Sequence, residues 1–144
     1  MKITEIICEI LRIESVEEKT ASSQDSIIIR VRTDTGLEGI GEADSSPEVV
    51  QAIIDAPFSH NIACGLRQIL IGENPLEIGR LWDRMYRETM YFGRSSVTIS
   101  AMAAINIALW DLKILIDTGN GTKWEEKYKK IYNIDTDRYS IELS

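Results

Sequence analysis

The sequence predicts an α+β fold, in which a three-stranded antiparallel meander is followed by a bundle of three to four helices. Two observations indicate this fold. Residues 2–43 hold three segments of strand character, and from Ser46 onward the apolar residues recur at helical spacing. The chain has 144 residues, of which 44% are hydrophobic and 27% are charged, as is typical of a domain with a packed core.

Strands are expected over residues 2–13, 26–32 and 37–43. In the middle segment, Ile27 and Ile29 alternate with polar or outward-facing neighbours, which is the pattern of a half-buried strand. A Thr-Asp-Thr-Gly run between the second and third segments supplies a turn. These features predict a meander of consecutive strands.

Four helices are expected after the meander. The first has Ser46 as its N-cap and ends before Pro57, and the second spans residues 61–70. The third begins at Asn74 with a capping-box pattern, and serines before residue 97 cap the fourth. The residues expected to face inward are Val49, Val50, Ile53, Ile54, Ile62, Leu66, Ile69, Leu70, Ile78, Leu81, Trp82, Met85, Tyr86, Met102, Ile105, Leu109 and Leu112.

Charge and hydropathy exclude several classes of function. The net charge is -7 and no basic cluster occurs, so nucleic acid is not an expected partner. No segment reaches the roughly 18 or more uninterrupted apolar residues of a membrane span, and the start of the chain lacks a secretory signal. We therefore expect a cytoplasmic protein without membrane contact, whose two cysteines are small buried side chains rather than a disulfide.

Three short strings carry a family resemblance. They are Gly-Ile-Gly-Glu-Ala at 39–43, Gly-Arg at 93–94 after two aromatic residues, and Ala-Ala-Ile-Asn-Ile-Ala-Leu-Trp-Asp-Leu-Lys at 103–113. Together and in this order they resemble the mandelate racemase and muconate-lactonizing branch of the enolase superfamily, over residues 1–113. Asn106 stands where the family usually has Asp, and Ile-Leu follows Lys113 where Gly-Lys is usual, so the subgroup stays open.

The resemblance implies an N-terminal capping domain that covers a catalytic (β/α) barrel. In that family, magnesium held by three barrel carboxylates stabilises the enediolate formed when a barrel lysine or histidine removes the proton next to a carboxylate. Racemisation, epimerisation, cycloisomerisation or dehydration of a sugar acid can follow. A barrel needs about 250 residues, so we expect this chain to be truncated before its barrel and to be inactive alone. Magnesium and a small carboxylate substrate are expected only for the complete parent enzyme.

Most candidate substrate-binding residues come from two segments that lie at the active site or barrel mouth in this family, and Arg94 is added because a guanidinium can bind a carboxylate. A polar loop over 14–25 matches the mobile active-site loop by position, although a plain solvated connection is the alternative. The segment after the third strand can instead cap a helix, and an arginine can anchor the domain rather than bind a carboxylate. The candidates are Ser22, Ser23, Gln24, Asp44, Ser45 and Arg94.

Other parts of the chain carry less chemistry. His60 and Cys64 are four residues apart, but a closed zinc site needs four ligands and the chain has one histidine, so no metal site is expected. The resemblance implies that the catalytic groups lie on the barrel, so no catalytic residue is expected in this chain. Residues 114–144 form an atypical tail, either a remnant of the barrel's first strand or unrelated sequence. An uncovered apolar helix face predicts a homo-oligomer. The alternative function is a stand-alone, non-catalytic interaction domain.

Overall fold

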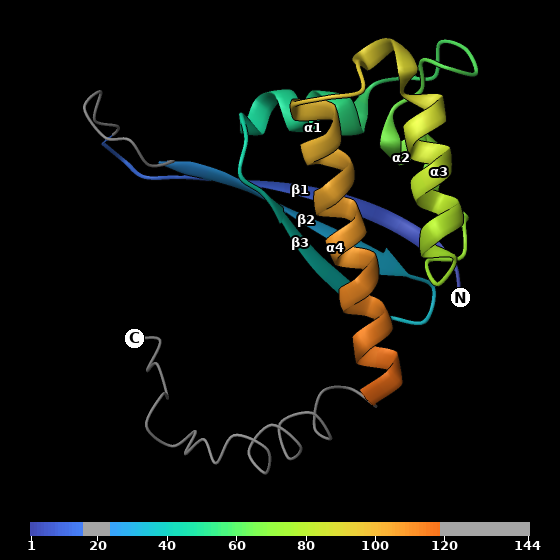
Figure 1. Cartoon of the computed structure of the whole chain (residues 1–144). Helices are drawn as coiled ribbons and strands as arrows, with labels where there is room; N and C mark the ends of the chain where they lie inside the picture. Colours follow the sequence, from blue (N-terminus) through green and yellow to red (C-terminus); the bar gives the residue numbers. More distant parts are fainter. Residues whose placement is uncertain (16–23, 119–144) are drawn as a thin grey trace, which may run out of the picture. The chain divides into compact units, whose positions relative to one another are not determined.

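The computed structural model describes residues 1–15 and 24–118. The backbone divides into two units, Met1–Leu112 and Lys113–Ser144, and only residues 113–118 of the second unit are described. The features below belong to the first unit unless stated otherwise. In chain order, the elements in Figure 1 are β1 (Ile3–Arg12), β2 (Asp25–Thr33), β3 (Glu38–Ala43), α1 (Pro47–Asp55), α2 (Leu66–Leu70), α3 (Ile78–Glu88), a 3₁₀ turn (Met90–Phe92) and α4 (Val97–Thr118).

The three strands form one antiparallel sheet in the order β1-β2-β3, so the predicted meander is confirmed. In the β1–β2 register Ile10 lies opposite Ile27, and in the β2–β3 register Ile27 lies opposite Ala43. A register irregularity between Ile3 and Glu5 adjusts the start of β1. The α+β fold class predicted from the sequence is therefore what the structure shows.

The two faces of the sheet have opposite chemistry because side chains alternate along each strand. The face toward the helices buries Ile27, Ile29 and Val31 completely. The other face carries a ladder of ion pairs that crosses all three strands. Its pairs are Glu5–Arg32 (3.1 Å), Arg32–Glu38 (2.6 Å), Glu38–Arg30 (2.8 Å) and Arg30–Glu9 (3.0 Å).

The helix α4 packs on the strand β3 without intervening side chains. Figure 1 shows α4 running across the sheet, and the contact is made at Gly39 and Gly41. A Cβ atom at Gly41 would overlap the carbonyl oxygen of Ala104, and one at Gly39 would overlap that of Ala108 and lie 2.7 Å from Leu112 Cγ. Glycine is therefore required on β3 by the close approach of the helix backbone.

A side chain of α4 also binds the free edge of β3. The backbone N–H of Ile40 donates a hydrogen bond to Asp111 Oδ2 at 2.9 Å. Among the described residues β3 is an edge strand, so no strand of that part of the chain pairs with this N–H on that side. The carboxylate thus satisfies a backbone donor that would otherwise be open to another strand.

The helices agree with the predicted order but differ in their ends. Ser46 is the N-cap of α1, with Pro47 following, yet Val49 is 46% exposed and the inward residues are Val50, Ile53 and Ile54. Val49 was therefore wrongly predicted to face inward, as was Tyr86 of α3, which is 36% exposed. The buried residues of α1 form one stripe along the helix, and Val49 lies just beyond the edge of that stripe.

The second and third helices are shorter than predicted. Instead of spanning 61–70, α2 comprises only Leu66–Leu70, because residues 59–64 form a tight turn with a bridge between His60 and Ala63. The predicted start of α3 at Asn74 is also wrong. The residues after Asn74 form a separate turn, in which Asn74 Oδ1 accepts a hydrogen bond from the Leu76 N–H at 3.2 Å, and Glu77 is the N-cap.

The long helix α4 confirms its predicted inward residues, with Met102, Ile105, Leu109 and Leu112 fully buried. The helix continues to Thr118, past the expected domain boundary after Lys113. By length and composition alone, Val97–Asp117 could cross a membrane, but the core helix of a soluble domain meets the same criterion. The predicted tail beyond residue 118 lies outside the described residues.

The glycine contact between β3 and α4 makes a paired stability prediction. We expect Gly41→Ala to destabilise the domain by about 3 kcal/mol or more, because the new methyl group overlaps backbone atoms that cannot rotate away. Gly79→Ala is the matched control, since a Cβ at Gly79 in α3 meets no atom within 4 Å. This control should be neutral or stabilise by up to about 1 kcal/mol. Urea unfolding of both variants measures the difference, and equal effects would show that close packing is not the constraint.

The edge hydrogen bond makes a second prediction. We expect Asp111→Ala to destabilise by about 1–3 kcal/mol, since it leaves the Ile40 N–H without its acceptor. Asp117→Ala is the control, because Asp117 makes a surface pair with Lys113 at 2.9 Å and such i,i+4 pairs contribute only about 0.3–0.5 kcal/mol. Thermal unfolding distinguishes the two, and a loss for Asp111→Ala no larger than the control's would contradict the edge role.

Candidate functional site

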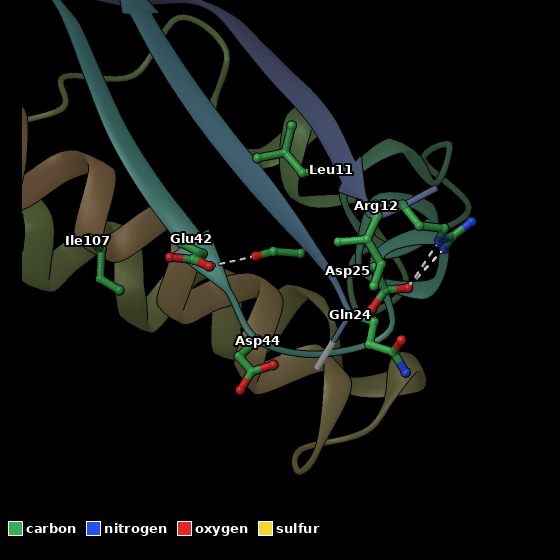
Figure 2. A pocket seen from close by; sticks show the side chains of 9 residues that line it. Leu11, Arg12, Gln24, Asp25, Glu42, Asp44 and Ile107 are labelled. Carbon is green, nitrogen blue, oxygen red and sulfur yellow. Dashed lines mark hydrogen bonds and ion pairs between the residues drawn. The ribbon is translucent and has the colours of Figure 1, made fainter. Parts of the chain in front are cut away.

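An open cavity of about 810 Å³ lies at the end of the sheet where β1 ends and β2 begins. Figure 2 shows side chains from β1, β2, β3 and α4 around it. Its lining combines apolar side chains with several charged or polar ones. The lining residues are Leu11, Arg12, Ile13, Gln24, Asp25, Ser26, Glu42, Asp44 and Ile107.

The cation on the cavity wall is bound by carboxylates of two different elements. Arg12, at the end of β1, pairs with Asp25 at the start of β2 at 3.0 Å and with Glu48 in the first turn of α1 at 2.7 Å. The hydrogen bond from Arg12 is the largest cause that holds the pKa of Glu48 below its ordinary value of 4.5. The guanidinium therefore favours the anionic form of the Glu48 carboxyl group.

Glu42 gives the wall a second polar contact. Ser26 Oγ donates a hydrogen bond to Glu42 Oε1 at 2.6 Å, across the β2–β3 pair (Figure 2). With Asp25 and Asp44, the lining contains three carboxylates and one guanidinium. The wall is consequently rich in hydrogen-bond acceptors and negative overall.

Only some of the predicted site residues lie at the cavity. Gln24 and Asp44 both line the cavity, although they belong to different connections, and Ser45 is half-buried next to Asp44. Ser22 and Ser23 lie outside the described residues. Whether any of these side chains contacts a substrate stays a prediction.

Arg94 does not belong to the cavity lining. Its guanidinium carbon lies 4.7 Å from the centroid of the Tyr86 ring, so it is held by a cation–π contact at the end of α3. It sits in a connection in which Gly93 and Ser96 both have positive φ, of 98° and 56°. The structure thus places the Arg94 side chain against Tyr86 of α3.

Sequence reasoning missed Arg12, Ser26 and Glu42 as lining residues. Arg12 was read only as the end of a strand, and Glu42 as part of the Gly-Glu-Ala string. The signal that could have found them is the strand register, since Arg12 lies opposite Asp25 and Ile28 opposite Glu42. Without a register, the alternation in each strand does not say which polar ends meet.

Metal ions in proteins are commonly held by clusters of side chains. In the ranges 1–15 and 24–118, no three His, Cys, Asp or Glu side chains come together in a way that could hold a metal. His60 is exposed and packs edge-on against Tyr91, whereas Cys64 is buried. Neither cysteine is activated as a nucleophile. Burial raises the pKa of the Cys8 thiol to about 11, and it also raises the pKa of the Cys64 thiol.

The comparison with protein families decides what kind of domain this is. Residues 7–115 match the model of the mandelate racemase / muconate lactonizing enzyme, N-terminal domain. The chain belongs to this family. The resemblance read from the strings at 39–43, 93–94 and 103–113 is therefore confirmed, as is the enolase-type fold of the N-terminal domain.

Relatives of this mandelate racemase-type domain include sugar-acid dehydratases. A D-galactonate dehydratase family member of Pseudarthrobacter chlorophenolicus is 34% identical over 94 residues, which are 65% of this chain and 21% of that protein. A D-mannonate dehydratase of Rhizorhabdus wittichii is 35% identical over 94 residues, 65% of this chain and 22% of the relative. The chain thus spans about a fifth of the length of the curated relatives it matches.

Solved structures give the same assignment. A racemase from Streptomyces coelicolor, crystallised with bound magnesium, superimposes with a TM-score of 0.65 at 26% identity. The match covers 81% of this chain and 33% of the racemase. Magnesium is thus found in a protein that shares this N-terminal domain, while the described part of this chain brings no metal ligands together.

The Arg12 contacts predict how the Glu48 carboxyl group titrates. We expect Arg12→Met to raise the pKa of Glu48 toward 4.5, since the variant removes the hydrogen bond that lowers it most. A pKa below the unfolded value means that the pair's stabilisation is complete above about pH 4.5 and is lost as the pH falls through the folded pKa. Carbon NMR of the Glu48 carboxyl group measures this shift.

Glu38 is the internal control for that titration. Its pKa is lowered first by the hydrogen bond from Arg32 and then by that from Arg30, on the outward face of the sheet. It should stay low in the Arg12 variant. Equal movement of both carboxyl groups would indicate a general change of the fold, and an unmoved Glu48 would contradict the pairing.

Proposed function

We propose that this chain is the capping and substrate-specificity domain of a magnesium-dependent enzyme that removes the proton next to a carboxylate, as a racemase, epimerase or sugar-acid dehydratase. The observation that carries the proposal is the family match over residues 7–115. The names of the relatives, which include D-galactonate and D-mannonate dehydratases, support sugar acids as the substrate class.

The cavity supports a role in substrate contact. It lies where the β1–β2 connection and the segment after β3 meet, and Gln24 and Asp44 on its wall come from these two segments. A sugar acid carries several hydroxyl donors and one carboxylate. The carboxylates of the wall suit hydroxyl groups as hydrogen-bond acceptors, whereas they would repel the acid group. In this proposal the acid group therefore binds away from this wall, near the magnesium ion that the rest of the complete enzyme would hold.

The chain by itself is proposed to be inactive. Proton removal in this family depends on a metal that stabilises the developing negative charge. Within the described residues no metal-holding group occurs, and both cysteine thiols have raised pKa values. The groups of this chain can bind and orient a substrate, but those that are described do not include the electrophile for the reaction.

A second domain is proposed to cover the apolar side of α4. Ile107 and Trp110 are 50% and 48% exposed. They lie about one helical turn apart on α4, so their side chains are neighbours on its surface. Burying such neighbouring side chains is favourable, so the free chain is expected to associate with itself through this face.

We propose a cytoplasmic protein that binds neither nucleic acid nor membranes. Its net charge of -7 supports the exclusion of nucleic acid.

Two assays test the function. The purified chain, with magnesium and D-galactonate or D-mannonate, should show no turnover. Residues 1–115 should restore dehydration when they replace the N-terminal domain of the Rhizorhabdus D-mannonate dehydratase, relative to that enzyme with the domain deleted. Turnover by the free chain would contradict its inactivity, and a chimera no better than the deletion would contradict the capping role and favour a stand-alone interaction domain.

Variants in the same chimera test the proposed domain contact. Trp110→Asp should lower kcat/KM by about tenfold or more, since a buried tryptophan at an interface commonly contributes that much. Val49→Asp is the control, because Val49 is also half-exposed but lies on α1. Similar losses from both variants would show that the effect is not specific to the α4 face.

A further inference from the structure

The guanidinium of Arg12 joins three elements that are far apart in the sequence. Its Nη2 donates to Asp25 Oδ2 at 3.0 Å and to Glu48 Oε1 at 2.7 Å, and its Nε donates to Asp25 Oδ2 at 3.3 Å. The partners are 13 and 36 residues away. One side chain therefore connects the end of β1, the start of β2 and the first turn of α1.

Asp25 is itself a cavity-lining residue, whereas Glu48 is not but follows one closely in the sequence. Asp25 directly follows Gln24, and Glu48 follows Asp44 after the short turn that begins α1. Gln24 and Asp44 approach the cavity from two separate connections. The β2–β3 ladder sets Ile27 opposite Ala43, directly before Asp44. The contacts that join the start of β2 to the start of α1 hold the segment after Asp44 as well.

We propose that Arg12 is a positioning residue that clamps the two segments bordering the cavity, so that Gln24 and Asp44 keep a fixed spacing. The consequence for a substrate rests on the proposed function, but the clamp itself is a property of this chain. Arg12 has its bonding groups directed at Asp25 and Glu48, so it acts through them on the cavity wall.

The contacts of Arg12 differ from those of the other paired arginines of the sheet. Arg30 also binds two carboxylates, Glu9 and Glu38, but all three residues lie on strands that backbone hydrogen bonds already join. Arg12 and Glu48 belong to a strand and a helix, which share no ladder of backbone bonds. Single exposed ion pairs stabilise weakly, whereas a guanidinium shared by two carboxylates forms a network with defined geometry.

Hydrogen exchange in the full chain tests the clamp directly. The Ile13 N–H donates to the Gln24 carbonyl at 3.1 Å and the Val50 N–H to the Ser46 carbonyl at 3.0 Å, so these amides report on the two segments. We expect Glu48→Gln to speed exchange at Ile13 by about fivefold, and Asp25→Asn to do so at Val50. Each variant is then detected in the segment that it does not belong to.

Two further variants complete this experiment. Arg12→Met should speed exchange at both amides, and adding Glu48→Gln to it should have no further effect at Ile13, because the connection is already broken. Arg30→Met is the matched control and should change neither amide. Exchange at Ile13 that responds to Arg12→Met but not to Glu48→Gln would overturn the proposal, since Arg12 would then act within the sheet alone.

The chimera with the D-mannonate dehydratase barrel tests the consequence for substrate. Arg12→Met should raise KM by about tenfold and leave kcat within about twofold, as expected when binding contacts rather than the chemical step are disturbed. Arg30→Met should change neither constant. An unchanged KM in the Arg12 variant, or an equal rise in both variants, would overturn the positioning role. An inactive unmodified chimera would instead contradict the proposed function, while the exchange experiment would still decide the clamp.

Discussion

The close approach of α4 to β3 is the constraint on which the rest of the domain depends. It requires that Gly39 and Gly41 carry no side chain, because the carbonyl groups of Ala104 and Ala108 occupy that space. The short distance in turn lets Asp111 reach the Ile40 N–H and brings Ile107 to the wall of the cavity. One glycine pair thereby connects the packing of the core to the edge of the sheet and to the candidate site.

The position of the helices on one face decides the chemistry of the other face. Residues such as Ile29 are removed from water by the helices, whereas Arg30 and Arg32 can remain hydrated and pair with glutamates of neighbouring strands. These pairs add little stability singly, yet they keep opposite charges next to each other across the sheet. The sheet therefore separates an apolar layer from a charged surface. The cavity lies at the end of the sheet where β1 ends and β2 begins, and it is lined by both apolar and charged side chains.

The fold could be predicted from the sequence further than the site could. Alternation in β2 and helical spacing in α4 are local patterns, and residues such as Val31 and Leu109 are buried as those patterns predict. Helix ends were less predictable, since the turn at Asn74 competes with the helix for the same capping chemistry. The site combines residues from β1, β2, β3 and α4, and their meeting depends on strand register and helix placement, which no local pattern encodes.

The segments beside the cavity are joined by ion pairs of Arg12 with Asp25 and Glu48. The cavity is open to water, so the segments around it cannot be joined by buried methyl groups without closing it. Charged hydrogen bonds tolerate partial exposure, and the side chain of Arg12 remains 44% accessible while it binds Asp25 and Glu48. Because salt and acid weaken such contacts, the spacing of Gln24 and Asp44 should be most sensitive to solution conditions while the glycine contact of α4 remains unchanged. Site geometry and core stability in this domain are thus governed by different interactions, and they can be altered separately.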